Sequence, residues 1–336
     1  MRCVFALLGL SLPTVFLLSL ALGPVYLPVV DIVRSLVDPS HSHPPQTQAI
    51  IAYIRLPRAL LAAMIGALLG ISGAAMQGLF RNPLADPSLI GVTAGASLGA
   101  SAMIVLGSDA VAGLGGLSLL SLGAFVGGMS AVLLVYYLAN HSAGGLSVTT
   151  MLLAGIGMTA LAGSITSIME LIADSGMLRR ISLWRMGGLD SATYLRVAMI
   201  TAVGGVVLVL LPRYSDALNA LLLGESEARH LGIDLAQVKY ALILLVATAV
   251  GLSVAMAGSI AFIGLVTPHI MRLLIGPDHR YLLPSSALAG AILLLLADTV
   301  ARTIIAPVEL PTGIVTAIIG APFFLSLLRR YRHGIA

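Results

Sequence analysis

The sequence predicts an all-α polytopic membrane protein with about ten transmembrane helices, and three observations support this fold class. First, 58% of the 336 residues are hydrophobic and only 10% are charged, whereas a soluble domain has about 25% charged residues. Second, apolar runs of about 20 residues, enough to span a membrane, recur along the chain. Third, the alternating ten-residue strands of an outer-membrane barrel are absent from the sequence. Soluble enzymes and nucleic-acid-binding folds are therefore excluded.

Ten apolar segments are predicted to span the membrane, and together they make residues 1–336 a single transmembrane domain. Their approximate ranges are 4–26, 57–80, 89–107, 115–139, 149–173, 194–212, 240–258, 259–275, 283–305 and 312–328. The first segment follows Arg2 and could pass for a signal peptide. No small-residue cleavage pattern follows it promptly, so we expect it to be retained as the first span.

Three polar stretches interrupt the apolar pattern. Residues 31–56 contain several prolines and form the first long loop. Residues 174–193 are long enough for one short helix that does not span. Residues 213–239 are the most hydrophilic part of the chain, and Gly224 and Gly232 divide them into two short amphipathic helices.

The distribution of arginines predicts an orientation. The cluster at 329–332 should be cytoplasmic by the positive-inside rule, and ten spans then place both termini and residues 213–239 inside. Eight arginines remain at or near the outer face: Arg34, Arg55, Arg58, Arg179, Arg180, Arg185, Arg196 and Arg302. Either the predicted topology is wrong, or the outer face is basic because a soluble acidic partner docks there.

Glycine is abundant, with 36 residues, which indicates closely packed helices. Gly91, Gly95 and Gly99 recur at four-residue spacing and are predicted to form one helix face that packs against a neighbour. The same stretch contains the Gly-x-Ser-x-Gly pattern around Ser97, which is typical of a nucleophile elbow. An intramembrane serine hydrolase is therefore a rival interpretation, and packing is the favoured one.

No catalytic residue, metal site or bound cofactor is predicted for this chain. Cys3 is the only cysteine, which excludes a disulfide framework and cysteine metal sites. Neither a His-Glu-x-x-His pair nor a P-loop occurs, so any ATPase that drives transport is a separate chain. His41 and His43 could bind a metal or haem iron, but we expect them to be loop histidines without one.

The charges within predicted spans are few, and each is a candidate functional residue. Asp298 and Arg302 lie four residues apart, so they share a helix face and can neutralise each other. Glu170 has no obvious partner on its own helix. Acidic residues do not recur across successive spans, which argues against an ion-coupled secondary transporter, the second rival interpretation.

Seven motifs, in unbroken order between residues 51 and 328, resemble the FecCD-type permeases of type II ABC importers, which import iron-siderophores, haem and vitamin B12. They are RLPR (55–58), GAAMQ (73–77), NPLADP (82–87), LGESEARHLG (223–232), FIGLVTPH (262–269), ADTVAR (297–302) and ELPTG (309–313). The resemblance implies a homodimer of ten-span subunits in the bacterial inner membrane. It also implies two cytoplasmic ATPase chains that bind ATP-Mg, and a periplasmic substrate-binding protein.

The resemblance also implies roles for individual residues. Arg55, Arg58 and Arg302 match the outer-face arginines that dock acidic side chains of the binding protein. The residues that match the cytoplasmic coupling helices, which sit in the ATPase groove, are Leu223, Gly224, Glu225, Ala228, Leu231 and Gly232. The residues that match the cytoplasmic gate are Ser147, Val148, Thr149 and Thr150, with Val148 at a position that is often polar in the family.

The cargo is the least determined feature of the resemblance. Residues 224–232, 275–280 and 306–311 look most similar to haem-importing members of the family. These segments are expected to face the ATPase or the periplasm, and not the substrate. The resemblance therefore favours haem, followed by a ferric siderophore and then cobalamin.

Overall fold

Each apolar segment that the sequence predicts as a span overlaps one helix of the structure, a computed structural model that describes residues 1–37, 45–107, 119–141 and 147–332. Within these ranges the regular structure is entirely helical, which confirms the predicted fold class. The ten helices are α1 (Arg2–Ala21), α4 (Leu56–Leu79), α5 (Val92–Leu106), α6 (Leu119–Asn140), α7 (Val148–Ile172), α9 (Tyr194–Leu210), α12 (Leu235–Ala257), α13 (Ile263–Ile275), α14 (His279–Thr303) and α15 (Thr312–Arg332).

Among the described residues, seven of these helices are long and apolar enough to cross a membrane, whereas α5, α13 and α15 are shorter apolar helices. A continuous run over Gln46–Leu79 includes α4, and another over Tyr194–Leu223 includes α9. Some ends differ from the prediction for local reasons. The first helix ends at Ala21 because Gly23 and Pro24 follow it. The number of helices that cross the membrane stays a prediction.

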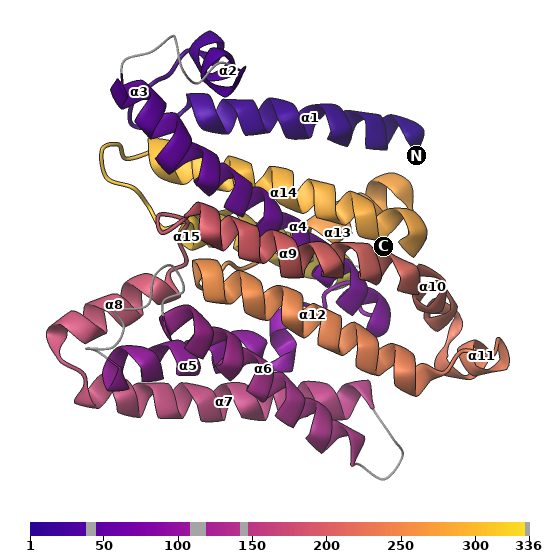
Figure 1. The fold of residues 1–336 in the computed structure, drawn as a ribbon. Helices are drawn as coiled ribbons and strands as arrows, with labels where there is room; N and C mark the ends of the chain where they lie inside the picture. The colour runs from indigo at the N-terminus through magenta and orange to yellow at the C-terminus, as the bar shows by residue number, and fades with distance from the viewer. Residues whose placement is uncertain (38–44, 108–118, 142–146, 333–336) are drawn as a thin grey trace.

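Among the described residues, five shorter α-helices connect the long ones, and they include those predicted in the polar stretches. They are α2 (Val29–Val37), α3 (Pro45–Ala49), α8 (Ser175–Arg185), α10 (Ser215–Leu223) and α11 (Glu225–His230). Asp174 caps the first turn of α8 by accepting a hydrogen bond from the Met177 N–H. Figure 1 shows α8 at one end of the bundle and α10 and α11 at the other, and we call these the α8 end and the α11 end.

Burial divides the long helices into central and peripheral ones. We compare the most apolar 18-residue window of each helix. The share of this window that is buried is 78% in the run that includes α4 and 72% in α12. It is only 17% in α1, and 22% in α7 and in the run that includes α9. The peripheral helices expose large apolar side chains, such as Leu153 and Ile156 of α7. Their surface suits lipid or a second subunit.

The central helices touch through their backbones, because glycines replace side chains at the contacts. A Cβ atom added to Gly66 of α4 would lie 2.3 Å from the carbonyl oxygen of Gly290 in α14. One added to Gly73 would lie 1.7 Å from the carbonyl oxygen of Gly264 in α13. These separations leave no space for even a methyl group. The structure therefore locks α4 against α13 and α14.

The predicted packing glycines divide into two kinds. A Cβ at Gly95 would lie 2.5 Å from the Gly127 oxygen of α6, and one at Gly99 would lie 2.0 Å from the Gly123 oxygen. Gly91 differs from the prediction, because it precedes α5 in a left-handed conformation (φ 82°) and does not belong to its helical face. Ser97 lies inside α5, and not on the strand-to-helix turn that a nucleophile elbow requires.

We predict that Gly66→Ala destabilises the protein by about 3 kcal/mol, because the added methyl group must displace a backbone carbonyl. The matched control is Gly205→Ala on α9, where no atom lies within 4 Å of the added Cβ. This control should be neutral or stabilising by up to about 1 kcal/mol through helix propensity. Thermal unfolding in detergent measures both variants, and equal midpoints would contradict the close contact.

Candidate functional site

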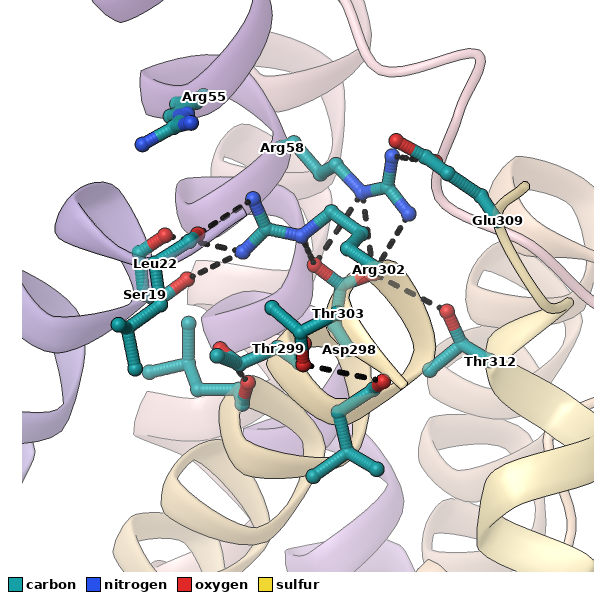
Figure 2. Close-up of polar contacts among 12 residues, drawn as sticks. Ser19, Leu22, Arg55, Arg58, Asp298, Thr299, Arg302, Thr303, Glu309 and Thr312 are labelled. Atoms are coloured by element: carbon teal, nitrogen blue, oxygen red, sulfur yellow. Dashed lines mark hydrogen bonds and ion pairs between the residues drawn. The ribbon is translucent and has the colours of Figure 1, made fainter. Parts of the chain in front are cut away.

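At the α8 end, a buried carboxylate joins two arginines from different helices. The carboxylate of Asp298 in α14 is fully buried and accepts from Nε of Arg58 in α4 at 3.0 and 3.2 Å. The Nε atom of Arg302, one helical turn further along α14, forms an ion pair with Oδ2 of Asp298 at 3.0 Å. The hydroxyl of Thr312 donates to Asp298 at 3.1 Å. Figure 2 shows Asp298 enclosed by these side chains, as a buried charge requires.

Arg58 also binds a second carboxylate. Its Nη1 donates to Oε2 of Glu309 at 2.6 Å. Glu309 lies in the segment 304–311 that joins α14 to α15, and its side chain is 36% exposed. Since Nη2 of Arg58 also pairs with Asp298 at 3.0 Å, every side-chain nitrogen of Arg58 has a carboxylate partner.

Arg55 and Arg302 hold the end of α1. Arg302 Nη2 donates to the Ser19 carbonyl at 2.9 Å. Arg55 Nη1 donates to the carbonyls of Leu20 at 2.6 Å and Ala21 at 3.0 Å. The last carbonyls of a helix have no partner within the helix and lie at its negative pole, so a guanidinium group both satisfies and stabilises them. The two arginines thereby fasten the peripheral α1 to the central helices.

The three arginines predicted to dock a partner, Arg55, Arg58 and Arg302, are buried within the chain. The three lie at the same end of the bundle, as predicted, but they are only 4%, 6% and 4% exposed. The physical reason is that a charge among apolar helices must find internal acceptors. Their docking role stays a prediction, and it requires a route to a buried group.

Most of the exposed arginines at this end belong to α8, and Arg34 of α2 is exposed as well. Arg179 and Arg180 face outward. Arg185 is 54% exposed and pairs with Glu170 of α7 at 3.0 Å, so the partner that Glu170 lacks on its own helix comes from α8. The eight arginines that the sequence predicts for the outer face therefore divide into an exposed set on α2 and α8, the half-buried Arg196, and a buried set of three.

A cavity of about 380 Å³ opens beside the buried arginines. Its charged lining residues are Arg58, Asp190, Arg196 and Glu309, and Trp184 of α8 contributes to its wall. The pair between Arg58 and Glu309 therefore borders a space that side chains from outside the chain could enter.

At the α11 end, the residues predicted to contact an ATPase form a corner that carries two exposed leucines. Leu223 and Leu231 are 69% and 64% exposed. Gly224 has φ 124°, which lets the chain turn between α10 and α11, and Gly232 follows α11. Ala228 differs from the prediction, because it is fully buried on the inner side of α11 and cannot contact a partner directly.

Glu225 anchors this corner to the bundle. Its carboxylate accepts from Nζ of Lys239 in α12 at 2.8 Å, and the lysine is 4% exposed. Oε1 of Glu225 is therefore used inside the bundle, so only part of this side chain could contact an ATPase as predicted.

Asn219 joins α10 to the first residues of α14. Its amide donates to Asp278 at 2.7 Å, and its oxygen accepts from the His279 backbone N–H at 2.8 Å and contacts His279 Nδ1 at 2.9 Å. The Arg280 backbone N–H and the Asn219 amide hold the pKa of Asp278 below its ordinary value, so the carboxylate stays charged in this joint. The exposed pair between Arg280 and Asp216, at 2.7 Å, lies beside it.

Several predictions are not tested by these contacts. The gate residues Ser147, Val148, Thr149 and Thr150 lie at the start of α7 and stay a prediction. His41 and His43 lie outside the described residues. In the part of the chain that the structure describes, no group of three or more His, Cys, Asp or Glu residues could hold a metal ion.

The sequence analysis missed the roles of Asn219 and Glu309. Glu309 lies in the ELPTG motif, but it is distant in sequence from Arg58, so no spacing rule links them. Asn219 sits in an apolar stretch of α10, where a lone polar residue is a signal that could have been noticed.

We predict that Asn219→Ala destabilises the protein by about 2 kcal/mol, because it leaves buried groups of His279 without their acceptor. The control Arg280→Gln breaks only an exposed ion pair and should cost less than about 1 kcal/mol. Thermal unfolding measures both variants, and an unchanged midpoint for Asn219→Ala would contradict a role for the joint.

Known proteins resemble this chain in sequence and fold. The FecCD transport family model matches residues 11–330. The hemin transport system permease protein HmuU of Yersinia pestis is 45% identical over 282 residues, 83% of each chain. The cobalamin import system permease protein BtuC of Halobacterium salinarum is 44% identical over 287 residues, 85% of this chain and 75% of that one. A metal-chelate type ABC transporter solved in an inward-facing conformation has a TM-score of 0.85 at 32% identity, covering 98% of this chain and 99% of its own. The chain therefore belongs to the FecCD transport family and is a permease of a type II ABC importer.

Proposed function

We propose that this chain imports an iron-containing chelate across the bacterial inner membrane by alternating access, with haem as the favoured cargo. It works as a homodimer with two cytoplasmic ATPase subunits and a periplasmic substrate-binding protein. ATP-Mg binds to the ATPase partners, and this chain itself binds no cofactor and performs no catalysis. Both termini and the α11 end are cytoplasmic, and the α8 end faces the periplasm.

The observation that supports this proposal most is the arrangement of α14. One end of this helix is joined through Asn219 to the corner that exposes Leu223 and Leu231. The other end holds the Asp298 carboxylate between two arginines. A single continuous helix therefore connects a surface suited to an ATPase with a charged site suited to a soluble protein. ATP-driven movement at one end can change the packing at the other.

The relatives support haem only slightly over the alternatives. The Yersinia relative named for hemin transport is 45% identical, and the Halobacterium relative named for cobalamin import is 44% identical. A ferric-siderophore or cobalamin permease of the same family is therefore the second candidate. An ion-coupled secondary transporter or a hydrolase that uses Ser97 is the alternative from another class.

Reconstitution in liposomes tests the proposed function. The permease is assembled with its cognate ATPase, and the binding protein is loaded in parallel with haem, a ferric siderophore or cobalamin. Haem uptake that needs ATP and stops with orthovanadate supports the proposal. Uptake of only another chelate would move the cargo assignment within the family, and uptake without the ATPase would reject the ABC mechanism. Ser97→Ala should leave uptake intact, since the hydrolase interpretation requires its loss.

We predict that Leu231→Asp weakens binding of the ATPase by at least about 30-fold, because a buried apolar anchor at an interface contributes about 2 kcal/mol or more. Leu231 is 64% exposed, so the free permease should keep its thermal midpoint. The control is Ala236→Asp, at an exposed site in the first turn of α12, where an acidic residue is favourable. Co-purification of the ATPase measures both, and equal recovery would contradict the docking role of Leu231.

A further inference from the structure

The two carboxylates that bind Arg58 differ in how firmly they are held. Asp298 is fully buried and has contacts with Arg58, Arg302 and Thr312. Glu309 is 36% exposed, and its pair with Arg58 is the contact that the structure gives for its carboxylate among the described residues. Breaking the Glu309 contact therefore exposes one guanidinium nitrogen, whereas breaking the Asp298 contacts would leave a buried charge without partners.

The backbone around Glu309 is anchored independently of that contact. The Leu310 N–H donates to the Ala301 carbonyl at 3.0 Å, and the Gly313 N–H donates to the Gly187 carbonyl at 3.0 Å. Thr312 is tied to Asp298. The Glu309 side chain can therefore leave Arg58 without detaching the segment between α14 and α15.

The space beside the pair suits an incoming acidic side chain. The cavity of about 380 Å³ that Arg58 and Glu309 border also receives Arg196 and Asp190. Among the described residues, Arg58 pairs with Asp298 and Glu309 and Arg302 pairs with Asp298, whereas Arg55 binds backbone carbonyls. A carboxylate from outside that replaced Glu309 would keep the charge balance of that network.

We propose that Glu309 is an exchangeable ligand of Arg58, whose place is taken by an Asp or Glu side chain of a soluble acidic protein that docks at the α8 end. Glu309 then weakens this docking in the free permease, because the partner must first displace an internal carboxylate. The inference rests on the proposed function for the identity of the partner, the periplasmic binding protein. It also explains how a buried arginine can take part in docking.

The test compares binding to the complete transporter in nanodiscs. Glu309→Gln should tighten binding of the cognate substrate-binding protein about tenfold, the effect of no longer breaking one charge-assisted hydrogen bond. The matched control is Glu170→Gln, which removes a carboxylate from the pair with Arg185 at the same end and should not tighten binding. Unchanged or weaker binding to a folded Glu309→Gln variant would overturn the inference. If this variant does not fold, Glu309→Asp, which keeps the charge but shortens the reach, is judged by the same criterion.

A second arm separates this inference from the proposed function. A fluorescein-labelled hexaglutamate peptide, with hexaglutamine as its control, replaces the binding protein. Tighter binding of hexaglutamate alone to Glu309→Gln supports the exchange whatever the cargo, and equal binding to wild type and variant opposes it. Failure of the proposed function would appear instead as absent ATP-dependent uptake by the wild-type transporter.

Discussion

The backbone contact between α4 and α14 is the constraint on which the other features depend. Lipid offers no hydrophobic driving force between helices, so their association relies on close van der Waals packing. Gly66 and Gly290 provide it, since neither places a side chain between the two helices. This contact sets the position of α14, which bears the Asn219 joint at one end and Asp298 at the other. A shift of α14 against α4 would disturb both ends together.

The buried ions follow from the same packing. A guanidinium group among apolar helices is costly unless its donors are satisfied, and Arg58 meets this requirement across the α4–α14 contact. Arg55 and Arg302 meet it with the terminal carbonyls of α1, as Figure 2 shows for Arg302. These charged contacts therefore hold α1, α4, α14 and the start of α15 together at the α8 end. Glu309 is the member of this network that water can reach, so it is the one whose contact with Arg58 can be exchanged.

The fold class and the approximate helices were predictable, because apolar length is a local property of the chain. The short helices in residues 174–193 and 213–239 were also predictable, since glycine and cap residues such as Asp174 mark their ends. Gly91 was misassigned because four-residue spacing cannot distinguish a helical face from a cap just before the helix. The Asp298–Arg302 pair was found because both residues lie on one helix.

The sequence by itself determined that the chain forms a helical bundle in a membrane. It also determined where glycines allow close packing and where the few charged residues lie along the chain. Its motifs also identified the family, because the seven motifs and their order can be read directly from the sequence. Only the tertiary structure decided that Arg58 meets Glu309, that Asn219 meets His279, and that the candidate docking arginines are buried. The physical reason is that the first two pairs are 251 and 60 residues apart, and the arginines are buried only because other helices pack over them. Helix packing alone brings them within hydrogen-bonding distance.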